Sequence, residues 1–89
     1  APKLADLTDD VLFADVWERS ELSPRERSLI TVAALIALGR DAQLKGHMGR
    51  ALQNGISREE LAEVATHLAF DAGWPAGMSA VNVLAEVGE

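Results

Sequence analysis

His47 is the residue whose type and position most directly suggest acid–base chemistry. It lies between two glycines in the stretch DAQLKGHMGR, residues 41–50. An imidazole has an ordinary pKa near 6.5, so it can accept or donate a proton close to neutral pH. On a helix it would share a face with Gln43 and Arg50 and would border the apolar side. The residues alone leave three readings open: a catalytic acid, a metal ligand, and a half-buried histidine bonded to a backbone carbonyl.

Glu26 is the second candidate for proton transfer. It ends the stretch SPRE, residues 23–26, in which Ser23 suits the N-cap of a helix and Glu26 suits the third helical position of a capping box. Its face continues through Ile30 into an apolar helix, so we expect the carboxyl group to be partly removed from water. Such burial would raise its pKa and allow proton exchange near neutrality. Capping and catalysis are compatible roles, and both remain open.

The arginines are the candidate ligands for an anion. Arg25 and Arg27 flank Glu26, and the planar guanidinium group binds a carboxylate through two parallel hydrogen bonds. Residues 1–58 contain all eight Lys and Arg residues, whereas residues 59–89 contain six acids and no base. Any anionic ligand must therefore be held by the first two-thirds of the chain. Solvated ion pairs are the alternative reading for these arginines.

His67 shares a predicted helix face with Glu63 and Asp71. These are residue types that bind metal ions, but three ligands stacked along one helix rarely converge on a single ion. We therefore expect a solvated or subunit-facing acidic surface here, and no metal site.

Composition excludes several classes of protein. The chain has 89 residues, a net charge of −6 and no cysteine. Thiolate catalysis, iron–sulfur clusters and disulfides are excluded, and the negative charge argues against nucleic acid binding. The apolar run LITVAALIAL, residues 29–38, is too short to span a membrane. A helix that is apolar on all sides in so small a domain favours burial against other subunits, so we expect a homo-oligomer. The N-terminus does not resemble a signal peptide, which favours the cytoplasm.

The elements that must position these side chains are predicted to be helices. We expect five, over residues 8–19 with Thr8 as N-cap, 24–39, 41–53, 57–73 and 75–87. The fourth would begin with a second capping box, formed by Ser57 and Glu60. Links of a few residues join them, so residues 1–89 should form one all-α bundle.

Two long segments resemble a known family. VWERSELSPRERSLITVAALIALGR and LKGHMGRALQNGISREELAEVATHLAFDAGWPAG are similar to the carboxymuconolactone decarboxylase family, within the alkylhydroperoxidase-D-like superfamily. The resemblance implies an all-helical subunit that assembles as a trimer or hexamer. A related branch has two cysteines where Arg40 and Gln43 stand here, so its thiol peroxidase chemistry is impossible in this chain. Members also have an additional segment before Trp17, so part of the pocket wall would be missing here or supplied by another subunit.

The resemblance also implies a reaction and roles for residues. The family's named reaction removes CO₂ from 4-carboxymuconolactone to give 3-oxoadipate enol-lactone, in aromatic degradation. The lactone carbonyl accepts the electrons, so no cofactor is expected. Arg27 and Arg40 would then bind the small anionic substrate, His47 would return a proton to carbon, Glu26 would orient or reprotonate His47, and Trp74 would line the pocket or pack structurally. Two alternatives remain: another cofactor-free proton-transfer enzyme acting on an enolisable acid or lactone, and a non-catalytic oligomeric binding protein.

Overall fold

The protein is all-helical in a computed structural model that describes residues 1–88. Five α-helices follow one another along the chain: α1 (Pro2–Leu7), α2 (Pro24–Leu38), α3 (Asp41–Gln53), α4 (Arg58–Asp71) and α5 (Trp74–Glu86). A π-helical turn, η1 (Thr8–Phe13), and a short 3₁₀ turn, η2 (Val16–Glu18), lie between α1 and α2. The all-α class and the number of helices predicted from the sequence are therefore confirmed.

The two predicted capping boxes are present at the starts of α2 and α4. The backbone N–H of Glu26 donates to the hydroxyl of Ser23 (3.1 Å), and the backbone N–H of Ser23 donates to the Glu26 carboxylate (2.8 Å). Ser57 and Glu60 make the same pair of bonds at the start of α4. Helix α2 ends at Gly39, whose φ of 70° lies in the left-handed region that glycine adopts most readily. These local signals fix where α2 and α4 begin and where α2 turns toward α3.

The predicted start of the first helix is wrong. Helix α1 begins at Pro2, and Thr8 has helical dihedral angles instead of capping a helix. Its hydroxyl donates to the carbonyl of Leu4 (2.8 Å), the bond that a threonine makes inside a helix. Proline at the first helical position has the φ that a helix needs, so the chain becomes helical earlier than expected. The predicted helix over 8–19 is also interrupted, since η1 ends at Phe13 and η2 begins at Val16.

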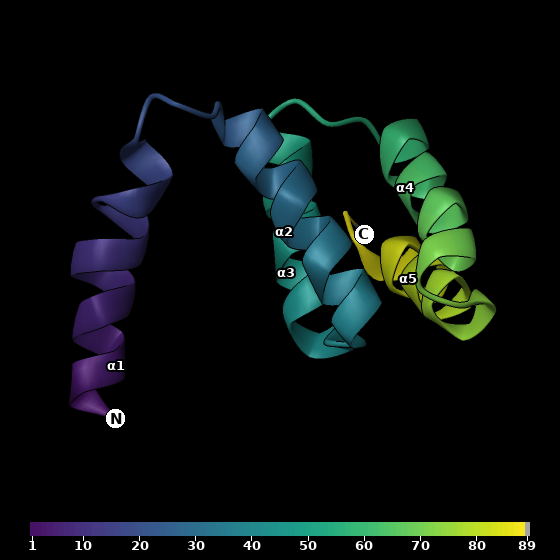
Figure 1. Ribbon diagram of the computed structural model, residues 1–89, viewed down its shortest axis with the longest axis horizontal. Coiled ribbons are helices and arrows are strands. Elements are labelled where there is room, and N and C mark those ends of the chain that lie inside the picture. The colour runs from purple at the N-terminus through teal and green to yellow at the C-terminus, as the bar shows by residue number, and fades with distance from the viewer. Residues whose placement is uncertain (89) are drawn as a thin grey trace.

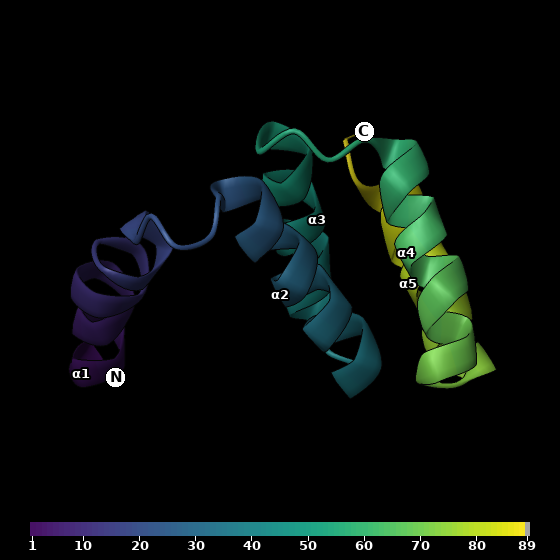
Figure 2. The same cartoon turned by 45° about the horizontal axis from the view of Figure 1, so that its top comes forward.

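The N-terminal segment, residues 1–19, stands to one side of the other four helices in both views (Figures 1 and 2). Helix α1 continues directly into η1, and η2 is the part that packs against α2. Several large apolar side chains of the segment are exposed: Leu4, Leu7, Val11, Leu12 and Val16.

The remaining helices form two closely packed pairs, α2 with α3 and α4 with α5, and Figure 2 shows each pair side by side. The core between them is apolar and consists of Val32, Ile36, Leu44, Met48, Ala51, Ile56, Leu61, Ala65, Ala80, Val83, Leu84 and Val87. Gly77 allows α4 and α5 to approach closely, because an added Cβ would lie 2.6 Å from the Cβ of Ala69. Within residues 1–88, no helix combines the length and hydrophobicity that crossing a bilayer requires.

Candidate functional site

His47 lies in the middle of α3, where its side chain contacts the N-terminal segment. Its imidazole stacks on the indole of Trp17 in η2, with ring centroids 6.4 Å apart and ring planes inclined by 27°. The imidazole is partly buried, and its Nδ1 atom is fully buried without a hydrogen-bond partner among the described residues. A buried polar atom without a partner is uncommon in folded proteins and is one mark of a functional site. The Nδ1 atom is therefore not bonded to a backbone carbonyl among the described residues, and a catalytic role for His47 stays a prediction.

Burial lowers the pKa of His47, and the nearby positive charge of Arg50 lowers it further. Both effects disfavour the imidazolium form, so His47 is mainly neutral at pH 7 in the free protein. A neutral imidazole can accept a proton directly. It can donate one only after it has been protonated, which an anion bound beside it would favour.

Arg50 lies one turn further along α3. Its guanidinium carbon is 4.4 Å from the ring centroid of Phe13 and 5.8 Å from that of Trp17. The rings of Phe13 and Trp17 also contact each other, with centroids 6.2 Å apart. A hollow of about 300 Å³ opens beside this cluster, lined by Phe13, Trp17, Glu18, Pro24, Arg50, Gln53 and Asn54.

Arg27 contacts the same segment from α2. Its Nη2 donates to the carbonyl of Arg19 (3.1 Å), and its buried Nε has no partner among the described residues. The neighbouring Ser28 is fully buried and accepts a hydrogen bond from the side chain of Asn54 (2.9 Å). This bond joins the start of α2 to the end of α3. Arg27 and His47 thus both face residues 17–19, which is compatible with the predicted role of Arg27 in binding an anion.

The raised pKa predicted for Glu26 is wrong. The hydrogen bond from the backbone N–H of Ser23, followed by one with its hydroxyl, lowers the pKa of Glu26, and Arg25 and Arg27 lower it further. The side chain is exposed, because the first turn of α2 directs it to the cap rather than to the core. Within residues 1–88, no hydrogen bond or ion pair connects Glu26 to His47. Its catalytic role stays a prediction without a contact that supports it.

Arg40 lies away from Arg27, and Trp74 lies away from both His47 and Arg27. Arg40 is exposed at the start of α3, beyond the opposite end of α2 from Arg27. The part of α2 between Arg27 and Leu38 is about 16 Å long at 1.5 Å per residue, so the two arginines are not brought together.

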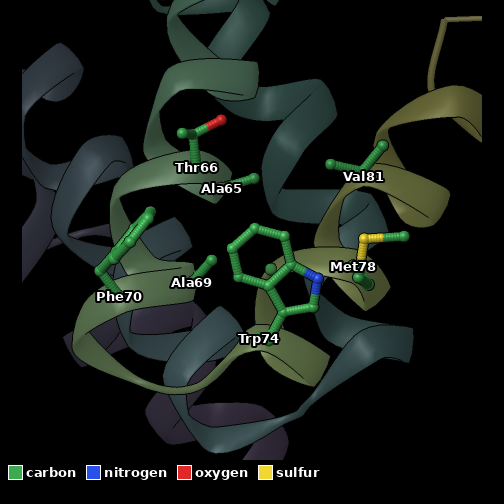
Figure 3. Close-up of a pocket in the computed structure, with 8 residues that line it drawn as sticks. Ala65, Thr66, Ala69, Phe70, Trp74, Met78 and Val81 are labelled. Atoms are coloured by element: carbon green, nitrogen blue, oxygen red, sulfur yellow. The ribbon is translucent and has the colours of Figure 1, made fainter.

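Trp74 lines a different pocket, at the start of α5 (Figure 3). The pocket is lined by Ala65, Thr66, Ala69, Phe70, Trp74, Gly77, Met78 and Val81, all of which belong to α4 and α5. The ring of Phe70 meets that of Trp74 edge to face, with centroids 5.9 Å apart. Both rings are largely exposed, with 78% of Phe70 and 63% of Trp74 accessible to solvent. Trp74 therefore lines a pocket, one of the two roles that the sequence analysis considered for it. That pocket is not the hollow beside Arg50.

His67 lies on the exposed face of α4. Its Nε2 is 3.0 Å from a carboxylate oxygen of Asp71. Glu63 and His67 border a groove between α2 and α4, together with the exposed ion pair of Arg25 and Glu60. In the part of the chain that the structure describes, no three acidic or histidine side chains are grouped closely enough to hold a metal ion.

The sequence interpretation missed three residues of the site: Trp17, Phe13 and Arg50. The shared helix face of His47 and Arg50 was visible in the spacing and could have identified Arg50. The aromatic partners come from residues about 30 positions earlier in the chain, and only the fold brings them together.

The fold and site therefore define a small all-helical protein. Its candidate site contains a partly buried histidine that stacks on a tryptophan, with arginines on the same and a neighbouring helix. The sequence profile of the carboxymuconolactone decarboxylase family matches residues 2–86, and the chain belongs to this family. It is 39% identical over 75 residues to a 4-carboxymuconolactone decarboxylase of Acinetobacter baylyi, covering 84% of this chain and 56% of that protein. It is 30% identical over 78 residues to a nitrosuccinic acid decarboxylase of Metarhizium robertsii, covering 88% of this chain and 54% of that protein. The chain thus spans about half the length of these curated relatives.

Proposed function

We propose that this protein is a cofactor-independent carboxy-lyase that decarboxylates 4-carboxymuconolactone or a closely related acid. The observation that supports this most strongly is the environment of His47, a partly buried imidazole with a free Nδ1 that is stacked on Trp17 and flanked by Arg50. Two relatives named as decarboxylases support the class of reaction. Residues 1–89 would constitute one domain of this family.

The chemistry requires an electron sink within the substrate. In 4-carboxymuconolactone, the C–C bond to the departing carboxylate breaks and its electron pair moves toward the lactone carbonyl, giving an enolate. A proton then adds to carbon and yields the enol-lactone. Nitrosuccinic acid is also a dicarboxylic acid with an internal electron sink, its nitro group. Another activated acid of this kind is therefore the second candidate substrate, and the name of the second relative favours it.

His47 would deliver the proton to carbon. A positioned general acid contributes about 10²–10⁴ in rate, and an imidazole is suited to this task near neutral pH. Arg27 would bind a substrate oxygen through its free Nε, since its Nη2 is already bonded to the carbonyl of Arg19. Glu26 would relay protons only through water, because its carboxylate is bonded to Ser23. Arg40 or Trp74 would reach such a substrate only from another copy of the chain.

A homo-oligomer, either a trimer or a hexamer, is part of the proposal. Large apolar side chains are exposed on the N-terminal segment and on α2, α4 and α5, including Ile30 (56%), Leu38 (69%) and Phe70 (78%). Burial of these side chains against other copies of the chain would remove apolar surface from water, which favours association. Size-exclusion chromatography with light scattering tests this part, and a monomer at all concentrations would contradict it.

The test of the function is CO₂ release by purified protein from 4-carboxymuconolactone and nitrosuccinate, with a non-activated dicarboxylic acid as control. We expect release from at least one of the first two and none from the control. No release from either activated acid, by protein whose helical circular dichroism is intact, would contradict the proposal.

A further inference from the structure

Arg50 differs in its hydrogen-bond and ion-pair partners from the other partly buried or paired cations of the chain. Arg19, Arg25 and Lys45 each form an ion pair with a glutamate. Two further guanidinium groups donate to backbone carbonyls, that of Arg58 to Val87 and Leu84, and that of Arg27 to Arg19. Within residues 1–88, the partly buried Arg50 has neither an ion pair nor a side-chain hydrogen bond, although Glu18 lines the same hollow.

The way Arg50 is held leaves its hydrogen-bonding edge available. Its guanidinium packs against the face of the Phe13 ring at 4.4 Å. A guanidinium stacked on a ring keeps the N–H groups in its plane free to bind a carboxylate. The partial burial of Arg50 strengthens any charge-assisted hydrogen bond formed there.

We propose that Arg50 is a carboxylate-binding residue that holds one end of a dicarboxylate, with the second carboxylate of the ligand directed toward His47. A carboxylate in the hollow would form two parallel hydrogen bonds with Arg50. The inference rests on the proposed function only where it concerns decarboxylation. Binding of a carboxylate by Arg50 does not require the protein to catalyse a reaction.

The position of Arg50 on α3 suits a ligand that reacts at His47. Side chains three residues apart on a helix have Cβ atoms about 5–6 Å apart, a separation spanned by a few carbon–carbon bonds. The hollow is lined by Arg50 and not by His47, so a dicarboxylate held by Arg50 would have to extend past Trp17 to bring its second carboxylate to His47. The carboxylate that departs as CO₂ gains from being away from a cation, since an ion pair would stabilise it before the reaction. Arg50 accordingly holds the carboxylate that the product keeps.

Binding at Arg50 also affects the charge state of His47. The charged side chains around the site are Arg50 on α3, Glu18 on η2 and Arg27 on α2. The positive charge of Arg50 is one cause of the lowered pKa of His47, and a bound carboxylate offsets that charge. The ligand thereby favours the protonated imidazole, the form that a general acid requires.

The test uses two probes that do not react, succinate and butyrate, at equal ionic strength. The pKa of His47 is followed by NMR of the imidazole protons, with a His67→Gln variant to assign the signals. We expect succinate to raise the pKa of His47 more than butyrate does. Arg50→Gln should abolish the difference and weaken succinate binding about tenfold to a hundredfold, the loss expected for hydrogen bonds to a charged group. Lys45→Gln, which removes a cation from the same helix, should bind succinate as the wild type does.

Equal effects of succinate and butyrate on the wild type, or wild-type succinate binding by Arg50→Gln, would overturn the proposal. If Arg50→Gln fails to fold, Arg50→Lys keeps the charge without the planar fork and should still lose affinity for succinate. Succinate binding that depends on Arg50, in a protein that decarboxylates neither activated acid, would refute the proposed reaction and leave the binding site intact. Decarboxylation without succinate binding that depends on Arg50 would refute the binding site and leave the reaction intact.

Discussion

The imidazole of His47 stacks on the indole of Trp17, with ring centroids 6.4 Å apart and planes inclined by 27°. This contact joins the middle of α3 to η2 in the N-terminal segment. It shields one side of the imidazole from water, and burial is the largest cause of the lowered pKa of His47. The state of the candidate acid therefore depends on a segment that stands largely apart from the helix bundle.

Replacing Trp17 with alanine should raise the pKa of His47 toward its ordinary range, because water would reach the ring. The pKa should stay below about 6.5, since the charge of Arg50 remains nearby. NMR titration of His47 measures the change. Trp74→Ala, which removes an indole from the pocket of α4 and α5, is the matched control and should leave this pKa as it is. An unchanged pKa in Trp17→Ala would show that the stack does not set it.

Stability should depend on pH through His47. Its pKa is lower in the folded protein than in the unfolded chain, where it is about 6.5. Below that value the unfolded chain binds more protons, so stability falls as the pH is lowered and is constant above it. Urea unfolding should therefore give a lower midpoint near pH 5 than near pH 8. The difference should shrink in His47→Gln, and an identical pH dependence in that variant would assign the effect to other groups.

The two roles considered for Glu26 can be separated by two substitutions. Glutamine also serves in a capping box, so Glu26→Gln should keep the stability of α2. Ser23→Ala removes the hydroxyl that caps the helix and should cost about 1 kcal/mol of unfolding free energy. In the decarboxylation assay, we expect Glu26→Gln to lose less than about tenfold in rate, below the range of a general acid. A loss as large as that of a His47 variant would instead establish Glu26 as a catalytic carboxylate.

Gly77→Ala should destabilise the protein by about 1–3 kcal/mol, the usual cost of overpacking a core. The new Cβ would lie 2.6 Å from the Cβ of Ala69 and 3.0 Å from the carbonyl oxygen of Ala65, so α4 and α5 would have to separate. Gly46→Ala on α3 is the control, since nothing lies within 4 Å of its added Cβ. It should stabilise the helix by about 0.5–1 kcal/mol. Urea unfolding of both variants tests the contrast, and equal midpoints would contradict it.

The sequence predicted those features that depend on neighbouring residues. The capping boxes at Ser23 and Ser57 are local, and both are confirmed. The first helix was mispredicted because two local signals compete, proline at position 2 and threonine at position 8, and the hydroxyl of Thr8 can bond within a helix.

The site was predicted less completely because its contacts are long-range. His47 and Arg27 were identified by residue type, but the contact between His47 and Trp17 joins residues 30 positions apart. The environment of Glu26 was mispredicted because the side chain follows the cap and not the apolar face of α2. No helical pattern places Trp74 on one side of the bundle or the other, since that depends on how α4 and α5 pack.

The proposed function depends on His47 as the general acid of a decarboxylation. This role is tested by kcat/KM for 4-carboxymuconolactone, or for nitrosuccinate if that is the acid turned over, in the wild type and in His47→Gln. Both proteins should have the same helical circular dichroism. We expect the variant to be slower by about 10²–10⁴, the contribution of a positioned proton donor. A folded His47→Gln variant with wild-type kcat/KM would contradict this role and leave His47 as a packing residue beside Trp17.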